Sequence, residues 1–387
     1  MNKENLYTLI DIGSSKIRLS VFDTYLNVKF SKSENINNHV DCFYNFDSIN
    51  NIVKEAEKKI SLHIKDVILI FDTVDIFTVD ISLNKNLDRK FKVNKIYESI
   101  ILELNQIISS NYNNYYHAHT IINKCVIDEK IFGDVPKNND IYKNIKIDFK
   151  IILFPGKTIL MLKEKFIKYN LNILNIFCTS YLKSLSYSKK LSFNKICFLE
   201  IGWERTSLIS LENDKLKFIK SIPVGGNHIT KDISKIFKIN LDQAEKIKKS
   251  FNKSETEFSY NATDKDSTIS VNGILSKNIS TDVLKKVILY RVQEIIDLTF
   301  KKSDLKIYRY NLSNFKLFLI GEGSSLLNNN SFYLNDKFEF ESINFYKETD
   351  AHICKSGLTY YLNNYQIPKI IQKNQGIFEK FFNYFSK

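Results

Sequence analysis

Glycine, proline and tryptophan are scarce in this chain of 387 residues, which contains 11, 4 and 1 of them. Lys, Asn and Ile are abundant along the whole sequence, a bias expected of an AT-rich genome. The formal net charge of +13 therefore reflects a general excess of lysine. A nucleic-acid groove needs clustered basic charge, whereas runs such as Lys246, Lys248 and Lys249 are typical of a solvated helix face. We expect no nucleic-acid partner.

Long apolar runs and paired cysteines are also missing. The five cysteines are odd in number, widely separated and never in a CxxC spacing, so they encode neither a disulfide framework nor a zinc site and fit a reducing cytoplasm. No uninterrupted apolar run approaches the roughly 20 residues that span a bilayer. Asp11 directly follows the first apolar stretch, which therefore cannot be the core of a signal peptide. Any membrane contact is expected to be peripheral.

The length favours two domains, or one clefted fold with subdomains. Strand-like stretches alternate with segments of helical periodicity, which is typical of an α/β fold, and helices are expected at 226–237, 281–301 and 350–363, among others. Asp11-Ile12-Gly13 ends one strand, and Glu200-Ile201-Gly202 ends another. Each is followed by a further strand with Lys or Arg at its start. This duplication predicts two similar halves.

Both turns place a carboxylate at a strand end, beside the backbone N–H groups of a short turn. Such a carboxylate can hold the water ligands of a metal ion, and the N–H groups can form a nest for an anion. A third turn, Gly321-Glu322-Gly323-Ser324, follows a late strand. A nucleoside triphosphate between two halves needs phosphate loops on both walls and a contact for its base. The three turns together therefore favour a nucleotide cleft over three ordinary hairpins.

The order and spacing of these turns resemble the actin, Hsp70 and sugar-kinase superfamily and, within it, the bacterial cell-division family FtsA. The resemblance covers nearly the whole chain. An extra subdomain placed near 84–148 also looks like FtsA rather than actin or MreB. The stretches that carry the resemblance are Leu9-Ile10-Asp11-Ile12-Gly13-Ser14-Ser15-Lys16, Phe198-Leu199-Glu200-Ile201-Gly202, Ile222-Pro223-Val224-Gly225-Gly226-Asn227-His228-Ile229-Thr230-Lys231-Asp232-Ile233, Ala244-Glu245-Lys246-Ile247-Lys248 and Leu319-Ile320-Gly321-Glu322-Gly323-Ser324.

The resemblance implies an α/β, actin-like two-domain fold with a nucleotide cleft, an FtsA-type inserted subdomain and a C-terminal amphipathic helix. Subdomain 1A carries the first phosphate loop and is interrupted by the insertion. The implied parts are 1–83 for subdomain 1A, 84–148 for the inserted subdomain 1C, 149–194 for the return to 1A, 195–362 for the second domain with subdomain 2B near 235–310, 363–374 for a linker, and 375–387 for the amphipathic membrane-targeting helix.

ATP and Mg²⁺ are the cofactors that the resemblance implies. Ser14, Ser15 and Lys16 would hold phosphates, and Asp11 would lie near the magnesium and contact it through water. Other positions would surround the ribose and base, although Glu245 and Lys248 fit a surface helix face equally well. No residue is expected to be catalytic. The implied ATP-site residues are Asp11, Gly13, Ser14, Ser15, Lys16, Glu200, Gly202, Thr206, Gly226, Glu245, Lys248, Gly321, Gly323 and Ser324.

The second phosphate loop departs from the family pattern, in which Asp is followed by a run of glycines and Thr. Here the loop reads Glu200-Ile201-Gly202-Trp203-Glu204-Arg205-Thr206. The bulky ring of Trp203 and the carboxylate of Glu204 both oppose phosphate binding there. The carboxylate does so because like charges a few ångströms apart repel. Glu322 is a smaller departure of the same kind. Either Arg205 compensates, or nucleotide binding is weakened or lost, so we expect weak or absent ATP hydrolysis.

The C-terminal segment carries one apolar helical stripe, opposite a face with Glu379, Lys380, Asn383 and Lys387. A helix of this kind lies in the membrane interface, or it docks on the protein's own core. Its place after a polar linker, its dense Phe content and its agreement with the family's membrane-targeting helix favour the membrane. The residues expected at the membrane are Ile377, Phe378, Lys380, Phe381, Phe382, Phe385 and Lys387.

The function that the resemblance implies is structural. The chain would tether FtsZ filaments to the cytoplasmic face of the inner membrane at the division site, and would self-assemble as actin does. The implied partners are the C-terminal tail of FtsZ, further copies of the chain, an anionic membrane surface and other divisome proteins. One alternative is a small-molecule kinase of the superfamily, although we find no substrate loop or catalytic Asp. Another is a pilus-assembly protein of the PilM type, which usually keeps its glycine-rich loops and lacks this terminal helix.

Overall fold

The computed structural model describes residues 5–36, 46–136, 140–253, 268–269, 279–302, 312–327 and 338–365. The predicted amphipathic helix at 375–387 and most of the predicted linker at 363–374 lie outside this part of the chain. Among the helices of the described part, none is both long and apolar enough to cross a membrane.

The first sheet is built from β1 (Tyr7–Ile12), β2 (Lys16–Phe22), β3 (Val28–Asn35), β4 (Asp66–Phe71) and β9 (Asn172–Cys178). Its five strands follow the order β3, β2, β1, β4, β9. β1 pairs antiparallel with β2 and parallel with β4. Both faces are covered by helices, which is why β1 and β4 are almost continuously apolar. The covering helices are α1 (Phe46–Ile60), α3 (Gly156–Lys168) and α9 (Asp350–Tyr365).

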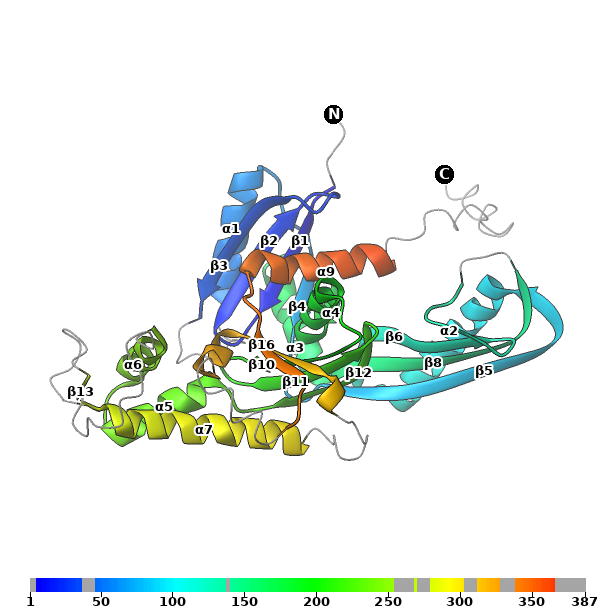
Figure 1. Cartoon of the computed structure of the whole chain (residues 1–387). Coiled ribbons are helices and arrows are strands. Elements are labelled where there is room, and N and C mark those ends of the chain that lie inside the picture. The colour runs from blue at the N-terminus through cyan, green and yellow to red at the C-terminus, as the bar shows by residue number, and fades with distance from the viewer. Residues whose placement is uncertain are drawn as a thin grey trace.

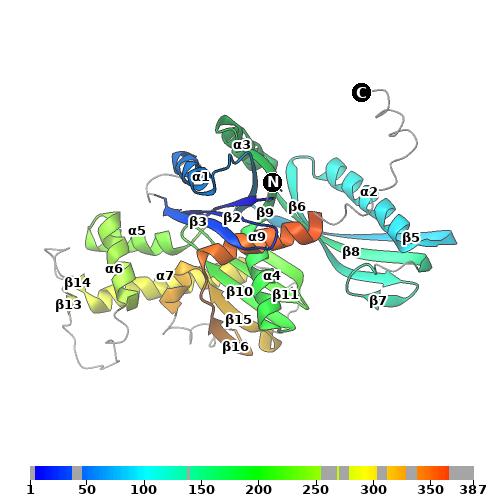
Figure 2. The same ribbon diagram turned by 90° about the horizontal axis from the view of Figure 1, so that it is seen from above.

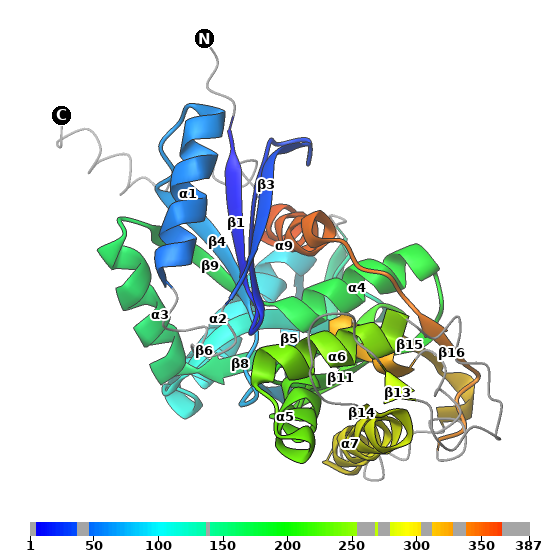
Figure 3. The ribbon, with the colours of Figure 1, turned by 90° about the vertical axis from the view of Figure 1, so that its left-hand side faces the viewer.

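The second sheet repeats this topology with β10 (Lys195–Ile201), β11 (Thr206–Glu212), β12 (Lys215–Ile222), β15 (Lys316–Ile320) and β16 (Ser342–Phe345). Its order is β12, β11, β10, β15, β16, again with antiparallel pairs on one side of the first strand and parallel pairs on the other. The predicted duplication is thereby confirmed. Figure 3 shows the helices on this half, α5 (Gly226–Phe237), α6 (Leu241–Lys253) and α7 (Thr281–Lys302).

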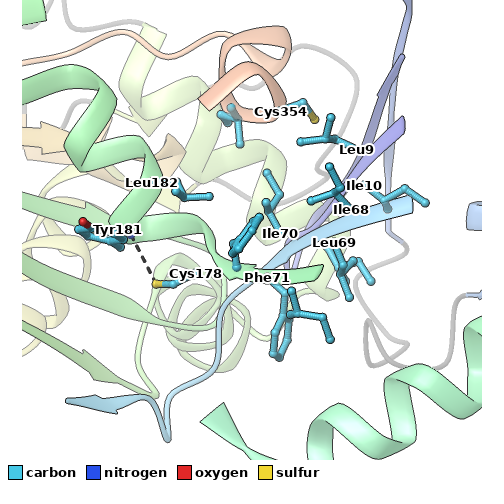
Figure 4. Packing of buried hydrophobic residues seen from close by; sticks show 14 of the residues in the cluster. Leu9, Ile10, Ile68, Leu69, Ile70, Phe71, Cys178, Tyr181, Leu182 and Cys354 are labelled. Atoms are coloured by element: carbon cyan, nitrogen blue, oxygen red, sulfur yellow. Dashed lines mark hydrogen bonds between the residues drawn. The ribbon is translucent and has the colours of Figure 1, made fainter. Parts of the chain in front are cut away.

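The helices α4 (Thr179–Leu191) and α9 contact each other between the two sheets (Figure 1). α4 also contacts the second sheet and α9 the first, so that one continuous apolar core joins them. Figure 4 shows Leu9 and Ile70 of the first sheet facing the helices that carry Leu182 and Cys354. α9 can approach the first sheet closely because Gly357 has no side chain. A Cβ atom at residue 357 would lie 2.9 Å from Leu9 Cδ2 and from Ile70 Cγ2.

A separate, inserted sheet contains β5 (Phe77–Lys92), β6 (Tyr115–Ile127), β7 (Lys130–Phe132) and β8 (Ile141–Pro155), in the antiparallel order β5, β8, β6, β7. The helix α2 (Val93–Asn111) packs its buried face on this sheet to form a core of its own. The inserted sheet extends away from the other two (Figure 2). β5 and β8 run without interruption across residues 84 and 148, so the division of the chain into domains remains a prediction.

The remaining described elements are short. β13 (Thr268–Ile269) pairs with β14 (Ile279–Ser280), and the 3-10 turns are η3 (Leu312–Asn314) and η4 (Glu322–Leu327). η4 follows β15 directly, which brings it to the same edge of the second sheet as the turn between β10 and β11. The parallel strands β1 and β4 end at the equivalent edge of the first sheet. The ends of the two sheets therefore enclose the site described next.

Candidate functional site

A cavity of about 140 Å³ lies where the turns after β1, β10 and β15 meet. Its wall contains the first turn (Gly13, Ser14 and Ser15), part of the second turn and Gly321. Gly13 closes the first turn by donating its N–H to the Lys16 carbonyl at 3.0 Å. A cavity at the ends of duplicated α/β sheets is a common place for a ligand. Its charged side chains decide what the cavity can accept.

The second turn is held by the start of α5. The N–H groups of Gly226 and Asn227 donate to the carbonyls of Gly202 and Trp203, at 2.9 and 2.8 Å. This contact requires glycine at 225, because a Cβ there would lie 2.6 Å from the Gly202 oxygen. N–H groups at a helix start are ready donors for an anion. Here these two donors are used within the protein.

Asp11 and Glu200, the acidic residues of the repeated motif, are both engaged. Asp11 accepts from Arg18 Nη1 at 2.7 Å and from Thr179 Oγ1 at 3.0 Å, one partner on each oxygen. Glu200 accepts from Lys183 Nζ at 2.5 Å, and its other oxygen lies 2.7 Å from Ser180 Oγ. Burial opposes the charge of Glu200, but the attraction of Lys183 and then of Arg205 outweighs it and lowers the pKa of Glu200 from 4.5 to about 2.

Arg205 crosses from the second turn to the first half. Its Nη2 donates to Asp72 Oδ2 at 2.5 Å, just beyond the end of β4. The pKa of Asp72 is raised, mainly because the carboxyl is buried. The nearby charge of Glu200 also raises this pKa, whereas the positive charge of Arg205 lowers it. The Asp72 oxygens also accept from the N–H of Ser180 and from the Cys178 thiol. Arg205 therefore compensates a carboxylate of the chain itself.

The segment that leads into α9 completes the charge network. Asp350 accepts from Arg18 Nε at 2.5 Å. Glu348 pairs with Lys183 at 3.0 Å and accepts the N–H of Gly321 at 2.9 Å. Burial alone would lower the pKa of Lys183, but its two carboxylate partners raise it above its ordinary value. Lys183 is thus a buried cation that links the second sheet to the segment before α9.

A second cavity, of about 60 Å³, adjoins the first through Ser15, Gly202, Trp203 and Glu322. Lys248 Nζ is held beside it by Glu245 at 2.6 Å, Thr230 Oγ1 at 2.8 Å and the Gly226 carbonyl at 3.0 Å. The same ammonium lies 4.8 Å from the centre of the Trp203 ring, within the range of a cation–π contact. Trp203 lines both cavities.

The structure brings most of the predicted site residues together. Those around the first cavity are Asp11, Gly13, Ser14, Ser15, Glu200, Gly202 and Gly321, and those around the second include Gly226, Glu245, Lys248 and Gly323.

Three predicted residues do not line either cavity. Thr206 is fully buried and donates to the Val224 carbonyl at 2.7 Å. Ser324 donates to the Gly321 carbonyl at 2.7 Å, and Lys16 turns its ammonium to Glu322 at 2.9 Å. In the structure, the polar side-chain atoms of these three residues therefore have partners within the protein.

Six charged or hydroxyl residues in or next to the first cavity were not predicted as site residues from the sequence. Arg18 follows the alternating polar face of β2, which is a weak signal for a role in the site. The others come from segments without a motif. The six are Arg18, Asp72, Thr179, Lys183, Glu348 and Asp350, of which all but Asp72 line the cavity.

A magnesium ion at Asp11 does not fit this arrangement. Magnesium sites in nucleotide-binding proteins use one or two carboxylates and several water molecules. Both oxygens of Asp11 already have protein partners, and so do both oxygens of Glu200. In the described part of the chain, no group of three or more His, Cys, Asp or Glu side chains could hold a metal ion. The built-in cations Arg18, Lys183 and Arg205 neutralise the carboxylates instead.

Sequence comparison relates the second half of the chain to FtsA. A family model described as "Cell division protein FtsA" matches residues 197–355. The cell-division protein FtsA of Neisseria meningitidis serogroup B is 34% identical over 103 residues. That match covers 26% of this chain and about a quarter (24%) of the length of the curated relative.

Structure comparison covers almost the whole chain. A type IV pilus biogenesis complex of PilM and PilN has a chain with a TM-score of 0.58 and 14% identity, over 91% of this chain and 90% of that one. MreB5 of Spiroplasma citri, bound to ADP, gives a TM-score of 0.51 with 12% identity over 95% and 99% of the two chains. Identities this low relate the folds alone, and they confirm the predicted actin-like α/β fold. Residues 197–355 are therefore similar in sequence to the FtsA family, and the chain as a whole has the fold of actin-like proteins.

Proposed function

We propose that the chain is a structural protein of cell division, which holds FtsZ filaments at the cytoplasmic face of the inner membrane and assembles with its own copies as actin does. The observation that carries this proposal is the FtsA sequence pattern of residues 197–355 on a duplicated actin-like fold. Other divisome proteins would be further partners. The cleft would serve this role as a scaffold, with weak or absent ATP hydrolysis, because its carboxylates are paired with side chains of the chain itself.

The FtsZ contact is proposed on the second half, near residues 235–310. In the described part of this region, apolar side chains are exposed on two helices: Ile236 of α5 is 51% exposed, and Val283 and Tyr290 of α7 are 41% and 69% exposed. α5 and α7 are fixed to each other by Arg291, whose Nε and Nη2 donate to Asp232 at 2.6 and 2.9 Å. A rigid surface with an exposed aromatic anchor suits the binding of a short peptide.

The membrane contact is proposed for residues 375–387, on the sequence pattern alone. Burying one Phe contributes roughly 1.5–3 kcal/mol at most, and a Lys near anionic lipid contributes about 1 kcal/mol. The cost of ordering the helix offsets part of this gain. One molecule would therefore bind reversibly, and lateral assembly of many molecules would raise the apparent affinity.

Flotation with anionic liposomes tests the membrane contact. The intact chain should float, whereas Phe382→Glu and a truncation after Asn374 should remain at the bottom of the gradient. Tyr25→Glu is the matched control, because it adds the same charge at an aromatic residue that is 83% exposed on the other half. If the three variants and the intact chain float equally, or if none floats, the membrane proposal fails.

Pull-down with the C-terminal tail of FtsZ tests the division role. Tyr290→Ser should reduce retention of the chain, whereas Tyr25→Ser should leave it unchanged, because Tyr25 is also an exposed tyrosine but lies outside the proposed surface. Absence of binding by the unmodified chain would exclude the role. Equal loss in both variants would exclude this surface.

Pilus assembly is the second candidate function. It is favoured by the structural similarity to the PilM–PilN complex, with a TM-score of 0.58 over 91% of this chain. The sequence match to FtsA weighs against it. A PilN-derived peptide in the same pull-down separates the two, since a PilM-like protein would retain that peptide in place of the FtsZ tail.

A further inference from the structure

In the described part of the chain, three of the contacts between the two halves involve the turns that surround the cleft. Lys16 of β2 reaches Glu322 of η4 with 2.9 Å between Nζ and Oε1. Arg205 of the second turn reaches Asp72, just beyond β4, at 2.5 Å. The N–H of Glu204 donates to Ser14 Oγ at 3.3 Å, so the first and second turns touch each other.

Contact between the turns leaves little room for a nucleotide. Pockets for ligands of that size commonly measure about 300–1,000 Å³. The first cavity measures about 140 Å³ and the second about 60 Å³, with Trp203 in the wall of both. A triphosphate between the two turns would have to break the Glu204–Ser14 hydrogen bond and part the two halves.

The charge of the cavity also opposes an anion. Its wall carries five carboxylates (Asp11, Glu200, Glu322, Glu348 and Asp350) and three cations (Arg18, Lys183 and Arg205), an excess of two negative charges. Every one of these cations is ion-paired with a carboxylate of the chain. A polyphosphate would therefore meet net repulsion, which the low dielectric of a partly buried site strengthens.

We infer that the cleft is closed by the chain's own contacts, Lys16–Glu322, Arg205–Asp72 and Glu204–Ser14, in the place where a metal-bound nucleotide would otherwise bridge the halves. The cleft is then a permanent clamp between the halves. This inference concerns the cleft alone and stands independently of FtsZ or lipid binding. Under the proposed function, it means that assembly of the chain is not gated by nucleotide.

Hydrogen–deuterium exchange of the full chain tests the clamp. The protein is freed of nucleotide with EDTA and phosphatase, and peptides covering residues 13–16 and 202–206 are followed with and without Mg-ATP. Both turns should be protected without nucleotide, and Mg-ATP should change their exchange rates by less than about twofold. Slowing of exchange by Mg-ATP well beyond that would overturn the inference, because it would show that nucleotide closes the cleft.

Variants distinguish a cross-cleft tie from an ordinary ion pair. Lys16→Met should accelerate exchange in both turns about 2- to 5-fold, the range expected when a partly exposed pair is lost. Lys32→Met is the matched control, because Lys32 pairs with Glu55 of α1 within the first half. The double variant Lys16→Glu with Glu322→Lys should restore protection. If Lys16→Met and Lys32→Met have the same effect on the turns, the inference is wrong.

The single tryptophan reports on the cleft directly, because Trp203 lines both cavities. Titration with ATP, ADP or Mg-ATP should give no saturable change in its fluorescence. A saturable change would overturn the inference even if exchange were unaltered. Failure of the liposome and FtsZ assays would leave these two readouts unchanged, so the clamp and the proposed function are tested separately.

Discussion

Removal of the buried cation Lys183 provides a quantitative test of the charge network. Lys183→Met keeps most of the side-chain volume but leaves Glu200 and Glu348 without their shared partner. The side chains of Lys183 and Glu200 are only 4% and 11% exposed, so water cannot replace the lost ion pair. Removal of one partner from a buried pair is strongly destabilising, because the remaining charge is uncompensated.

The magnitude follows from the pKa of Glu200, which is lowered from 4.5 to about 2. At roughly 1.4 kcal/mol per pKa unit, that shift corresponds to about 3 kcal/mol of stability, and loss of one partner of a buried pair typically costs about 3–5 kcal/mol. Because the folded-state pKa lies below the unfolded-state value, this stabilisation is complete above pH 4.5 and is lost as the pH falls towards 2. In Lys183→Met, burial raises the pKa of Glu200. The loss of stability of this variant, relative to the unmodified chain, should therefore be largest at neutral pH and should become smaller as the pH falls.

Urea unfolding followed by circular dichroism between pH 7.5 and pH 4.5 measures this deficit. Lys150→Met is the matched control: Lys150 is equally buried, but its partner Asp80 has a side chain that is 59% exposed and stays hydrated when the lysine is lost. That control should lose about 1 kcal/mol or less. The reasoning is refuted if the two variants are equally destabilised at neutral pH, or if the deficit of Lys183→Met does not shrink as the pH falls.

Three further predictions concern stability and use the same unfolding curves. Gly357→Ala should cost about 1–3 kcal/mol, because its methyl group would lie 2.9 Å from Leu9 Cδ2 in a filled core; a neutral result would mean that α9 moves freely. Gly321→Ala should cost about 1–3 kcal/mol, because residue 321 has φ of +84° and a Cβ would lie 2.6 Å from the Ile201 oxygen; unchanged stability would contradict this geometry. Burial lowers the pKa of His119 well below 6.5, so the unfolded state binds a proton that the folded state does not as the pH falls below 6.5. This group therefore lowers the free energy of unfolding in that range. His119→Gln should reduce the pH dependence of the free energy of unfolding there by up to about 1.4 kcal/mol per pH unit. An unchanged slope would show that His119 accepts a proton in the folded state.

Local patterns were sufficient to predict much of the fold. The helix expected at 226–237 is α5 with the same bounds, and those expected at 281–301 and 350–363 are α7 and α9 within two residues. The repeated acidic-Ile-Gly motif predicted the duplicated sheets, because each copy ends a strand and begins a tight turn. These features depend on residues that are neighbours in the sequence.

The helix α4, by contrast, which lies between β9 and β10 in the sequence, was not expected. Its sequence is rich in Ser and Tyr and lacks an amphipathic stripe, because the helix is buried between the two sheets and α9. Small hydroxyl side chains such as Ser184 and Ser188 allow this close packing. A helix covered on several sides has no polar face that periodicity could detect.

The charge network could not be predicted for a related reason. Its members come from five separate segments: Arg18 on β2, Asp72 after β4, Lys183 on α4, Arg205 in the second turn, and Glu348 and Asp350 before or at the start of α9. The sequence showed that the second phosphate loop was unusual. Only the folded arrangement shows that Arg205 pairs with Asp72 across the cleft.

The position of α9 determines when this protein can fold during its synthesis. α9 covers the first sheet, and its first residue, Asp350, bonds Arg18 from 332 residues further along the chain. The strands of the first sheet therefore remain without one of their covering helices until α9, which follows β1 by more than 300 residues, has been translated. Contacts between such distant segments slow folding and expose apolar strands meanwhile. The first half should depend on chaperones during translation more than the second half, whose sheet and helices are made within one continuous stretch.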